Sequence, residues 1–266
     1  MKNSLIHSSA IVESGAKLGK NVSVGPYAII ESGAQIGDNC QIQSHAIVKR
    51  HAVLGDGVEV GHFSVIGGDP QHMSFDRTVS SQAVVEDGAR IGEGVTVHRS
   101  IEKNGQTRVG ESCFLMGYSH VAHDCTVGKN VVLANGVLLG GHVHIGSDSF
   151  LGGGAAVHQF IRIGQGAMVG GLAEISLDVP PQVLVAGRNV LSGLNLIGLK
   201  RRKTSAMEVS ELKRCFGKVF GSQNLKKAAE EMLEGCDGPA SPIAQDFLAF
   251  FSSGTRGFAK YAKKKG

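Results

Sequence analysis

Two histidines and an acid in the stretch SHVAHDCTVG, residues 119–128, are the residues of this sequence best suited to acid–base chemistry. Asp124 directly follows His123, and His120 lies three positions before it. Imidazole titrates near about pH 6.5, so it can take a proton from an attacking hydroxyl or amine. A neighbouring carboxylate can fix its tautomer and stabilise the imidazolium. A catalytic pair, a metal site and ordinary surface histidines are therefore the three interpretations to compare.

A six-residue repeat surrounds this stretch on both sides. From Val12 to Ile66 every sixth residue is aliphatic, and a smaller side chain stands two positions before most of them. The repeat resumes one residue out of frame at Val85 and runs again from Val109 to Ile175. A period of six excludes an amphipathic helix but suits short strands, because side chains alternate between the faces of a strand. Three units close one coil of 18 residues, so we expect a triangular parallel β-helix with coils about 4.8 Å apart.

Two segments interrupt the repeat, and a different pattern follows it. GDPQHMSFDRTVSSQ at residues 68–82 and RSIEKNGQ at residues 99–106 have no six-residue period, so we expect functional surface loops. From about residue 200, three stretches have helical spacing, with Ser or Asn at their expected N-caps. The predicted fold class is all-β with an α appendage: a β-helix domain over residues 1–190 and a small C-terminal helical domain over residues 191–266.

The composition indicates the redox state of the cysteines and the cellular location to expect. The 266 residues include five cysteines without a CxxC pair, which favours reduced thiols, and Cys40, Cys113 and Cys125 take the small inward position of the repeat. The sequence shows neither a signal-peptide h-region nor an apolar run of transmembrane length, so we expect a cytoplasmic protein without stable membrane insertion. Much of the net charge of +4 lies in the end TRGFAKYAKKKG. We expect this end to be solvated, and binding of acidic partners is the less favoured alternative.

The 18-residue coil predicts which histidines gather. His123, His142 and His158 fall at remainders 15, 16 and 14 on division by 18, so they should lie near one edge of the prism on successive coils. A zinc site is the rival interpretation. His120 and His123 are an odd number of residues apart and should point to opposite faces of a strand, which argues against a shared metal. We therefore expect no metal ligands. Whether His120 is a surface residue, a subunit contact or part of the site stays open.

The motifs of the second half resemble a known family. HVAHDCTVG, LANGVLLGGHVHIG, AAVHQFIRIG, MVGGL, DVPP and NLIGLKRR follow one another as they do in the acyl-ACP–UDP-N-acetylglucosamine O-acyltransferases, which begin lipid A synthesis. The resemblance covers nearly the whole chain. It implies a left-handed β-helix, a homotrimer with active sites between subunits, acyl carrier protein as donor of a 3-hydroxyacyl chain, and a UDP-linked amino sugar as acceptor. It implies neither a metal nor another cofactor beyond the acyl-ACP co-substrate, and no nucleic acid.

The resemblance also assigns roles by position. It makes His123 the general base, Asp124 its orienting acid, Gly141 the backbone donor to the thioester oxyanion, and Gly171 the residue that limits acyl-chain length. The candidate substrate-binding residues are Gln71, His72, His120, His142, His158, Gln159, Asn195, Arg201 and Arg202. The last three match residues near the nucleotide, where the planar fork of arginine suits a diphosphate.

The first loop departs from the family pattern. The family has an acid and a lysine after the glutamine; here Gln71 is kept, but His72 and Ser74 replace them, and Ile197 stands where glutamate is common. The acceptor could therefore be a variant nucleotide sugar, including one acylated on an amine. A non-catalytic β-helix binding protein is the alternative from another class, and the intact pair of His123 and Asp124 argues against it.

Overall fold

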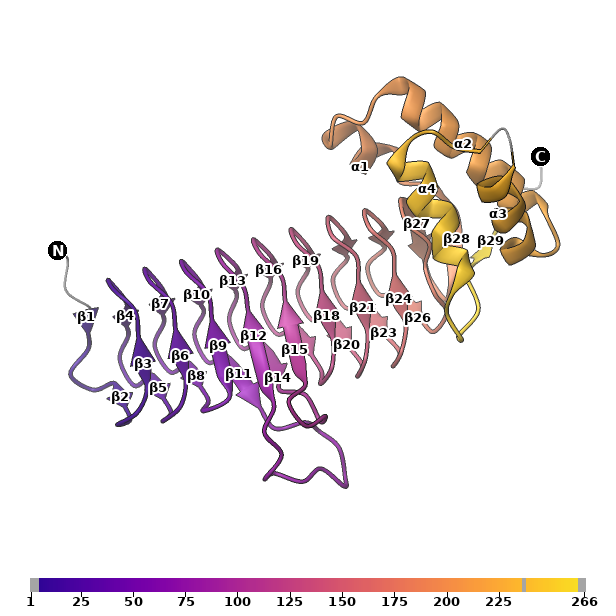
Figure 1. The fold of residues 1–266 in the computed structure, drawn as a ribbon. Coiled ribbons are helices and arrows are strands. Elements are labelled where there is room, and N and C mark those ends of the chain that lie inside the picture. Colours follow the sequence, from indigo (N-terminus) through magenta and orange to yellow (C-terminus); the bar gives the residue numbers. More distant parts are fainter. Residues whose placement is uncertain (1–4, 236–237, 263–266) are drawn as a thin grey trace.

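The computed structural model describes residues 5–235 and 238–262. The chain winds from its N-terminal end into a long prism of stacked coils, and helices cover the C-terminal end (Figure 1). Two loops project from one side of the prism, between β11 and β12 and between β14 and β15. The predicted parallel β-helix followed by helices is confirmed.

Three sheets form the three sides of the prism. The first contains β1 (Leu5–Ile6), β4 (Ser23–Val24), β7 (Gln41–Ile42), β10 (Glu59–Val60), β13 (Arg90–Ile91), β16 (Phe114–Leu115), β19 (Val132–Leu133), β22 (Phe150–Leu151), β25 (Met168–Val169), β27 (Val183–Ala186), β28 (Val190–Leu194) and β29 (Lys260–Tyr261). The second contains β2 (Ile11–Val12), β5 (Ile29–Ile30), β8 (Ile47–Val48), β11 (Val65–Gly68), β14 (Thr96–His98), β17 (His120–Val121), β20 (Leu138–Leu139), β23 (Ala156–Val157) and β26 (Glu174–Ile175). The third contains β3 (Lys17–Leu18), β6 (Gln35–Ile36), β9 (Ala52–Leu54), β12 (Gln82–Val85), β15 (Gln106–Val109), β18 (Thr126–Val127), β21 (His144–Ile145) and β24 (Arg162–Ile163).

Register across the sheets explains the frame shift in the repeat. Ile42 pairs with Val60, 18 residues on, whereas Val60 pairs with Ile91 after 31 residues and Ile91 with Leu115 after 24. The extra residues are the two predicted loops, which leave the coil and return to it. The inward aliphatic side chains stack into one core from Val22 onward, and the three expected cysteines are buried in it. Burial raises the pKa of the Cys113 thiol to about 11, as expected for an inert core thiol.

The C-terminal helices are α1 (Leu196–Arg201), α2 (Ala206–Gly221), α3 (Leu225–Glu234), α4 (Pro242–Ala249) and the 3₁₀ helix η1 (Phe250–Ser252). The helices α2, α3 and α4 begin directly after the predicted Ser or Asn caps, whereas α1 was not predicted. Ser205 and Glu208 form a capping box, and the Asn224 side chain accepts a hydrogen bond from Lys227 N. None of the helices among the described residues has the length and apolar character needed to cross a bilayer.

The basic end is not simply solvated. β29 pairs with β28 in parallel, and Ala259 is fully buried. The expectation of a solvated end is therefore wrong for the buried Ala259 and for the paired backbone of β29, although the side chains of Arg256 and Lys260 are exposed as expected. Lys263, Lys264 and Lys265 lie outside the described residues. The last strand of the prism, β28, ends at Leu194, and the first helix begins at Leu196. After the helices, β29 pairs with β28, so the C-terminal end of the helical region is joined to the prism. The division into two domains at residue 190 stays a prediction.

Candidate active site

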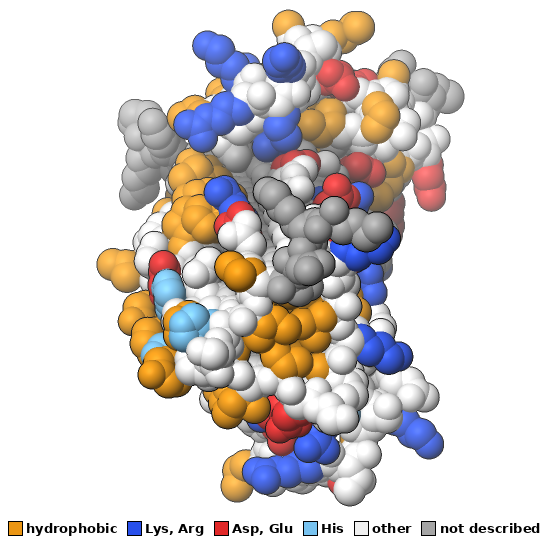
Figure 2. Space-filling view, turned by 90° about the vertical axis from the view of Figure 1, so that its left-hand side faces the viewer, with side chains coloured by type: hydrophobic (Ala, Val, Ile, Leu, Met, Phe, Trp, Pro, Cys, Tyr) orange, Lys and Arg blue, Asp and Glu red, His pale blue; other side chains and the backbone are white. Residues whose placement is uncertain are grey.

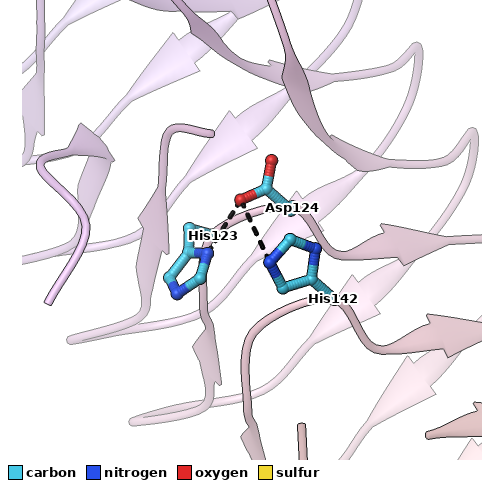
Figure 3. Close-up of side chains that lie close together, drawn as sticks. All are labelled: His123, Asp124 and His142. Carbon is cyan, nitrogen blue, oxygen red and sulfur yellow. Dashed lines mark hydrogen bonds and ion pairs between the residues drawn. The ribbon is translucent and has the colours of Figure 1, made fainter. Parts of the chain in front are cut away.

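His123 and Asp124 form a close pair at a corner of the prism, between β17 and β18. His123 Nδ1 lies 2.8 Å from Asp124 Oδ2, and His142 Nε2 lies 3.9 Å from the same oxygen (Figure 3). The rings of His123 and His142 meet edge to face, with centroids 5.2 Å apart. Because an ionised carboxylate only accepts hydrogen bonds, Nδ1 of His123 carries its proton toward Asp124, and Nε2 is left free to act as a base.

Three groups from the second loop and the next strand hold Asp124. Ser100 Oγ donates to Oδ1, Ile101 N donates to Oδ2 at 3.2 Å, and the Asp124 N–H donates to Thr107 Oγ1 at 2.8 Å. Burial alone would raise the pKa of the Asp124 carboxyl, but the hydrogen bonds from Ser100, His123 and Ile101 outweigh burial and lower it. The carboxylate is therefore charged at neutral pH and fixed in place.

The absence of a side chain at Gly141 leaves the space that the His123 imidazole occupies. A Cβ at this buried position would lie 2.6 Å from Cε1 and 2.7 Å from Nε2 of His123, so any side chain would displace the ring. The main chain of the same corner is also fixed, since His142 N donates to His123 O at 3.0 Å and Phe160 N donates to Gly141 O at 3.0 Å. Gly141 therefore lies beside Nε2 of His123, and its role as the oxyanion donor, which the resemblance implies, stays a prediction.

The first loop folds back onto this corner. The ring of His72 meets His123 edge to face, with centroids 6.1 Å apart. Gln71, Met73 and Ser74 are exposed beside it. Of the two loop residues that depart from the family pattern, His72 is therefore the one that meets the imidazole of the pair.

His120 is packed rather than free at the surface. Its Nδ1 lies 2.7 Å from Thr96 Oγ1, and its ring meets His98 with centroids 4.8 Å apart. Burial, followed by the charge of His123, lowers the pKa of His120. His98 is 8% exposed, and its Nδ1 has no hydrogen-bond partner among the described residues. Burial, with the charges of His120 and His123, lowers the pKa of His98 to about 4.

Sequence reasoning missed His98. It lies directly after the inward Val97, and its approach to His120 depends on the 24-residue step between β14 and β17, in which Thr96 pairs with His120. Ser100 and Thr107 were missed for the same reason, because neither lies near Asp124 in the sequence. The only available signal was the HRS triplet at the start of the second interruption.

Other predicted positions are not all brought to the pair. Phe160, rather than His158, continues the column, since its ring stacks on His142 with centroids 4.5 Å apart. His158 is exposed, and the one hydrogen bond of its side chain within the described part of the chain joins Nδ1 to the Gln159 carbonyl at 3.3 Å. Gln159 is also exposed.

The three positions expected near the nucleotide lie at another corner. Asn195 is buried, with Nδ2 donating to Gly166 O and Oδ1 accepting from Gly198 N, each at 3.0 Å, so its side chain caps α1. Arg202 contacts Gln182, and Arg201 lines an apolar pocket with Asp148. Asp148 follows His142 by six residues, which is one full side of the prism. Within one protomer, these residues and His123 therefore do not share a pocket.

The pair and His142 are also the one group of potential metal ligands among residues 5–235 and 238–262. One atom each of His123, Asp124 and His142 lies within 4.8 Å of the others. The Asp124 oxygen that would bind a cation already accepts the His123 Nδ1 and Ile101 N–H groups. A metal would have to displace the His123 hydrogen bond, so the donor set fits a hydrogen-bonded pair better than a metal site.

Comparisons with known proteins agree along the chain. The family model described as UDP N-acetylglucosamine O-acyltransferase, domain 2, matches residues 178–259, and the bacterial transferase hexapeptide model matches residues 33–68 and 106–141. The acyl-[acyl-carrier-protein]–UDP-N-acetylglucosamine O-acyltransferase of Herminiimonas arsenicoxydans is 40% identical over 262 residues, covering 97% of this chain and 100% of that protein. The corresponding protein of Sinorhizobium fredii is 38% identical over 251 residues, covering 92% of each chain.

Solved structures show the same similarity. The UDP-N-acetylglucosamine acyltransferase from Campylobacter jejuni superposes with a TM-score of 0.91 at 35% identity, over 97% of this chain and 100% of that chain. The enzyme from Francisella novicida gives 0.91 at 32% identity, over 98% of this chain and 95% of that one. Because a mirror-image coil would not superpose in this way, the expected left-handed β-helix is confirmed.

Proposed function

This chain belongs to the acyl-[acyl-carrier-protein]–UDP-N-acetylglucosamine O-acyltransferase family, and we propose that it performs that transfer. The donor is a 3-hydroxyacyl chain on acyl carrier protein, the acceptor is the sugar hydroxyl of UDP-N-acetylglucosamine, and the reaction is the first step of lipid A biosynthesis. The observation that carries the proposal is the His123–Asp124 pair at 2.8 Å, with Nε2 of His123 open beside Gly141.

Each group in the pair has a defined task. His123 Nε2 takes the proton of the sugar hydroxyl as its oxygen attacks the thioester carbon, and Asp124 stabilises the imidazolium that forms. The Gly141 N–H would stabilise the oxyanion of the tetrahedral intermediate. When the C–S bond breaks, the imidazolium returns the proton to the departing thiolate. General base catalysis of this kind contributes about 10² to 10⁴ in rate, which is roughly 3 to 5 kcal/mol.

We further propose that the working form is a homotrimer with each site shared between neighbours. The separation of Arg201 and Arg202 from His123 within a protomer supports this, because the nucleotide and the base must meet in one site. An exposed apolar edge gives a second argument. Tyr27, His45 and Phe63 stack along one corner with ring centroids 5.1 and 5.0 Å apart, and hydrophobic and histidine side chains gather along one edge in Figure 2. Such an edge is typical of a surface that a second subunit covers.

Neither a metal nor another cofactor is part of the proposed reaction, since imidazole supplies the proton transfer and the thioester supplies the activated acyl group. We place the protein in the cytoplasm, where its thiols would stay reduced.

A second acceptor is the alternative that one observation favours. His72 contacts His123, although the family pattern has an acid at this position, and Ile197 lines the pocket of Arg201. The same acyl-transfer apparatus could therefore serve a variant UDP-amino sugar, on oxygen or on nitrogen.

One assay decides between these functions. Purified protein is incubated with a panel of acyl-ACPs and nucleotide sugars, and the products are identified by mass spectrometry. We expect acyl-UDP-N-acetylglucosamine, loss of most of the turnover in His123→Ala, and unchanged turnover in the matched control His7→Ala. Product from a variant sugar alone would favour the second acceptor, and no product from the whole panel would refute both. Chelator treatment should leave the activity intact, and loss that only zinc restores would contradict the metal-free mechanism.

A further inference from the structure

Arg99 is the largest fully buried side chain of the described chain that carries a charge, with 1% of its surface exposed. Each of its three guanidinium nitrogens donates at least one hydrogen bond. Nε donates to Asp69 Oδ1 at 2.9 Å, NH1 donates to Val79 O at 2.5 Å and to Ser81 Oγ at 3.1 Å, and NH2 donates to Arg77 O at 3.0 Å. A buried charge of this kind is tolerated only when it is paired and hydrogen-bonded; here Asp69 supplies the opposite charge, and four of the five N–H groups donate hydrogen bonds.

Every one of these partners lies in or beside the first loop, residues 69–81. The contacts begin at Asp69, where the loop leaves β11, and end at Ser81, where it enters β12. The guanidinium also lies 4.7 Å from the centre of the Phe75 ring in the middle of the loop. One planar side chain therefore holds both ends and the middle of an exposed segment that has no strand or helix of its own.

The residues next to Arg99 hold the catalytic acid. Ser100 Oγ and Ile101 N donate to the Asp124 carboxylate. Ser81 Oγ, which accepts a hydrogen bond from Arg99, donates to Ser100 O at 2.6 Å. The tripeptide Arg99–Ser100–Ile101 thus fixes Asp124 on one side and the loop on the other, and the loop carries His72 to the ring of His123.

We propose that Arg99 is a positioning residue that holds the loop 69–81 as a rigid wall of the acceptor site, with His72 set against the catalytic base. The inference rests on the proposed function. The hydroxyl that loses its proton to His123 belongs to the nucleotide sugar, so the residue in contact with His123 from the loop side faces that substrate. The loop then selects the acceptor sugar, and Arg99 determines how well the loop is ordered before the sugar binds.

Arg99→Lys and Arg99→Met test this by steady-state kinetics with both substrates. Lysine keeps the charge but cannot form the planar set of bonds, and methionine removes both. We expect the KM for the nucleotide sugar to rise about tenfold or more in Arg99→Met and less in Arg99→Lys, while the KM for the acyl donor changes by less than about twofold. A uniform loss of kcat with both KM values unchanged would overturn the proposal.

A second measurement does not depend on activity. Arg77 is the one trypsin site of the loop, and its side chain is 85% exposed. A released loop should be cut faster between Arg77 and Thr78, so we expect faster cleavage in both Arg99 variants. Arg162→Met is the matched control, because Arg162 makes a similar set of bonds to Asp178 and to the C-terminal segment at Phe250 and Ser253. It should leave the rate of cleavage at Arg77 unchanged.

The kinetic measurement and the trypsin cleavage together distinguish failure of the role of Arg99 from failure of the proposed function. If Arg99→Met does not fold, Asp69→Asn and Phe75→Ala, which keep Arg99 in place, should raise the sugar KM and the cleavage rate in the same direction. Unchanged cleavage together with an unchanged sugar KM in these variants would refute the role of Arg99. A wild-type protein inactive on every nucleotide sugar would instead refute the proposed function, and cleavage at Arg77 would still show whether Arg99 holds the loop.

Discussion

Asp124 has two roles at one position of the chain. Its φ of 61° lies in the left-handed region and turns the corner between β17 and β18, a conformation that Asp tolerates because its short side chain can form local hydrogen bonds. The same corner places its carboxylate beside the His123 ring. His142 and Phe160 occupy the equivalent corner on the next two coils, with φ of 60° and 64°. The catalytic geometry is therefore a consequence of how the coil turns.

Gly141→Ala should uncouple activity from folding. The new Cβ would lie 2.6–2.7 Å from His123 ring atoms, and this partly exposed ring can tilt away at little cost. Because a misplacement of about 1 Å can cost about a hundredfold in rate, we expect kcat to fall by about that factor. Gly217→Ala, where a Cβ meets nothing within 4 Å, is the matched control. Turnover and melting temperature are measured for both variants, and a normal kcat in Gly141→Ala would contradict the assigned geometry.

Ser100→Ala should change the pH dependence of the reaction. Without the Ser100 hydroxyl, the pKa of Asp124 rises toward its ordinary value, because one of the hydrogen bonds that lower it is lost. Because the ionised carboxylate is the form that orients His123, this change moves the acid limb of the kcat/KM profile to higher pH. Ser100→Thr keeps the hydroxyl and should restore the wild-type profile, and an acid limb that stays in place in Ser100→Ala would exclude a role for this bond.

At the scale of elements, the strands could be read from the sequence and the loops could not. The aliphatic residues at every sixth position must point inward, and the one-residue shift of the repeat at Val85 indicates an insertion before it. The path of that insertion depends on the buried contacts of Arg99, which no period encodes. For this reason the positions of the histidines within the 18-residue coil correctly predicted that His123 and His142 lie close together, but they could not predict that His72 meets His123. The strand β29 was missed because a basic end resembles a solvated tail.

The coil around β25 contains the position expected to limit the acyl chain. Gly171 is exposed, and the left-handed residue of its corner is Leu172, with φ of 55°, so the turn itself does not require glycine at 171. An added Cβ would lie 3.3 Å from Gly153 O, in tight contact with the coil before it. These observations favour a role in leaving space over a role in turning.

Gly171→Met should therefore shift the donor preference from long to shorter 3-hydroxyacyl chains. Each CH₂ that loses its burial costs about 0.8 kcal/mol, so exclusion of four would cost roughly 3 kcal/mol, a change in preference of over about a hundredfold. The kcat/KM values for a series of acyl-ACPs measure this change. An equal loss for all chain lengths, or a wild-type preference for short donors, would show that Gly171 does not set chain length.

At the scale of the whole molecule, the buried histidines make folding depend on pH. Folded His98 stays neutral down to about pH 4, whereas in the unfolded chain it binds a proton below about 6.5. Between these values the unfolded state binds more protons, so the stability of the fold decreases as pH falls. The full effect of His98 is on the order of 3 kcal/mol, and His120 acts in the same direction.

The free energy of unfolding of the wild type should therefore fall between pH 7 and pH 4.5, and it should fall less in His98→Gln. Urea unfolding at one fixed protein concentration measures this, because oligomer stability depends on concentration. His7→Gln, at an exposed position, is the control and should keep the wild-type dependence. An identical pH dependence in His98→Gln and the wild type would mean that His98 is not held neutral by the fold.

The arrangement of the corners leads to a test of the assembly. Arg201 lies at the corner of Asp148, one side of the prism from the corner of His142 and His123, which supports the proposal that the two residues serve one substrate from different subunits. In a closed ring of three, every site would combine the His123 corner of one subunit with the α1 end of its neighbour. His123→Ala and Arg201→Ala should each be inactive alone, yet their mixture should regain activity when the two chains are co-expressed.

With random assembly, every mixed trimer has one site in three that receives an intact His123 from one subunit and an intact Arg201 from the next, so the selected mixed trimers should recover about a third of wild-type activity. The measurement is specific activity after purification with two different tags, which selects mixed trimers. His123→Ala mixed with Asp124→Asn is the control, because both changes lie on the same subunit's corner. In that mixture every site contains either the His123 change or the Asp124 change, so the mixture should stay inactive. Equal activity of the two mixtures would show that His123 and Arg201 serve the same subunit's substrate.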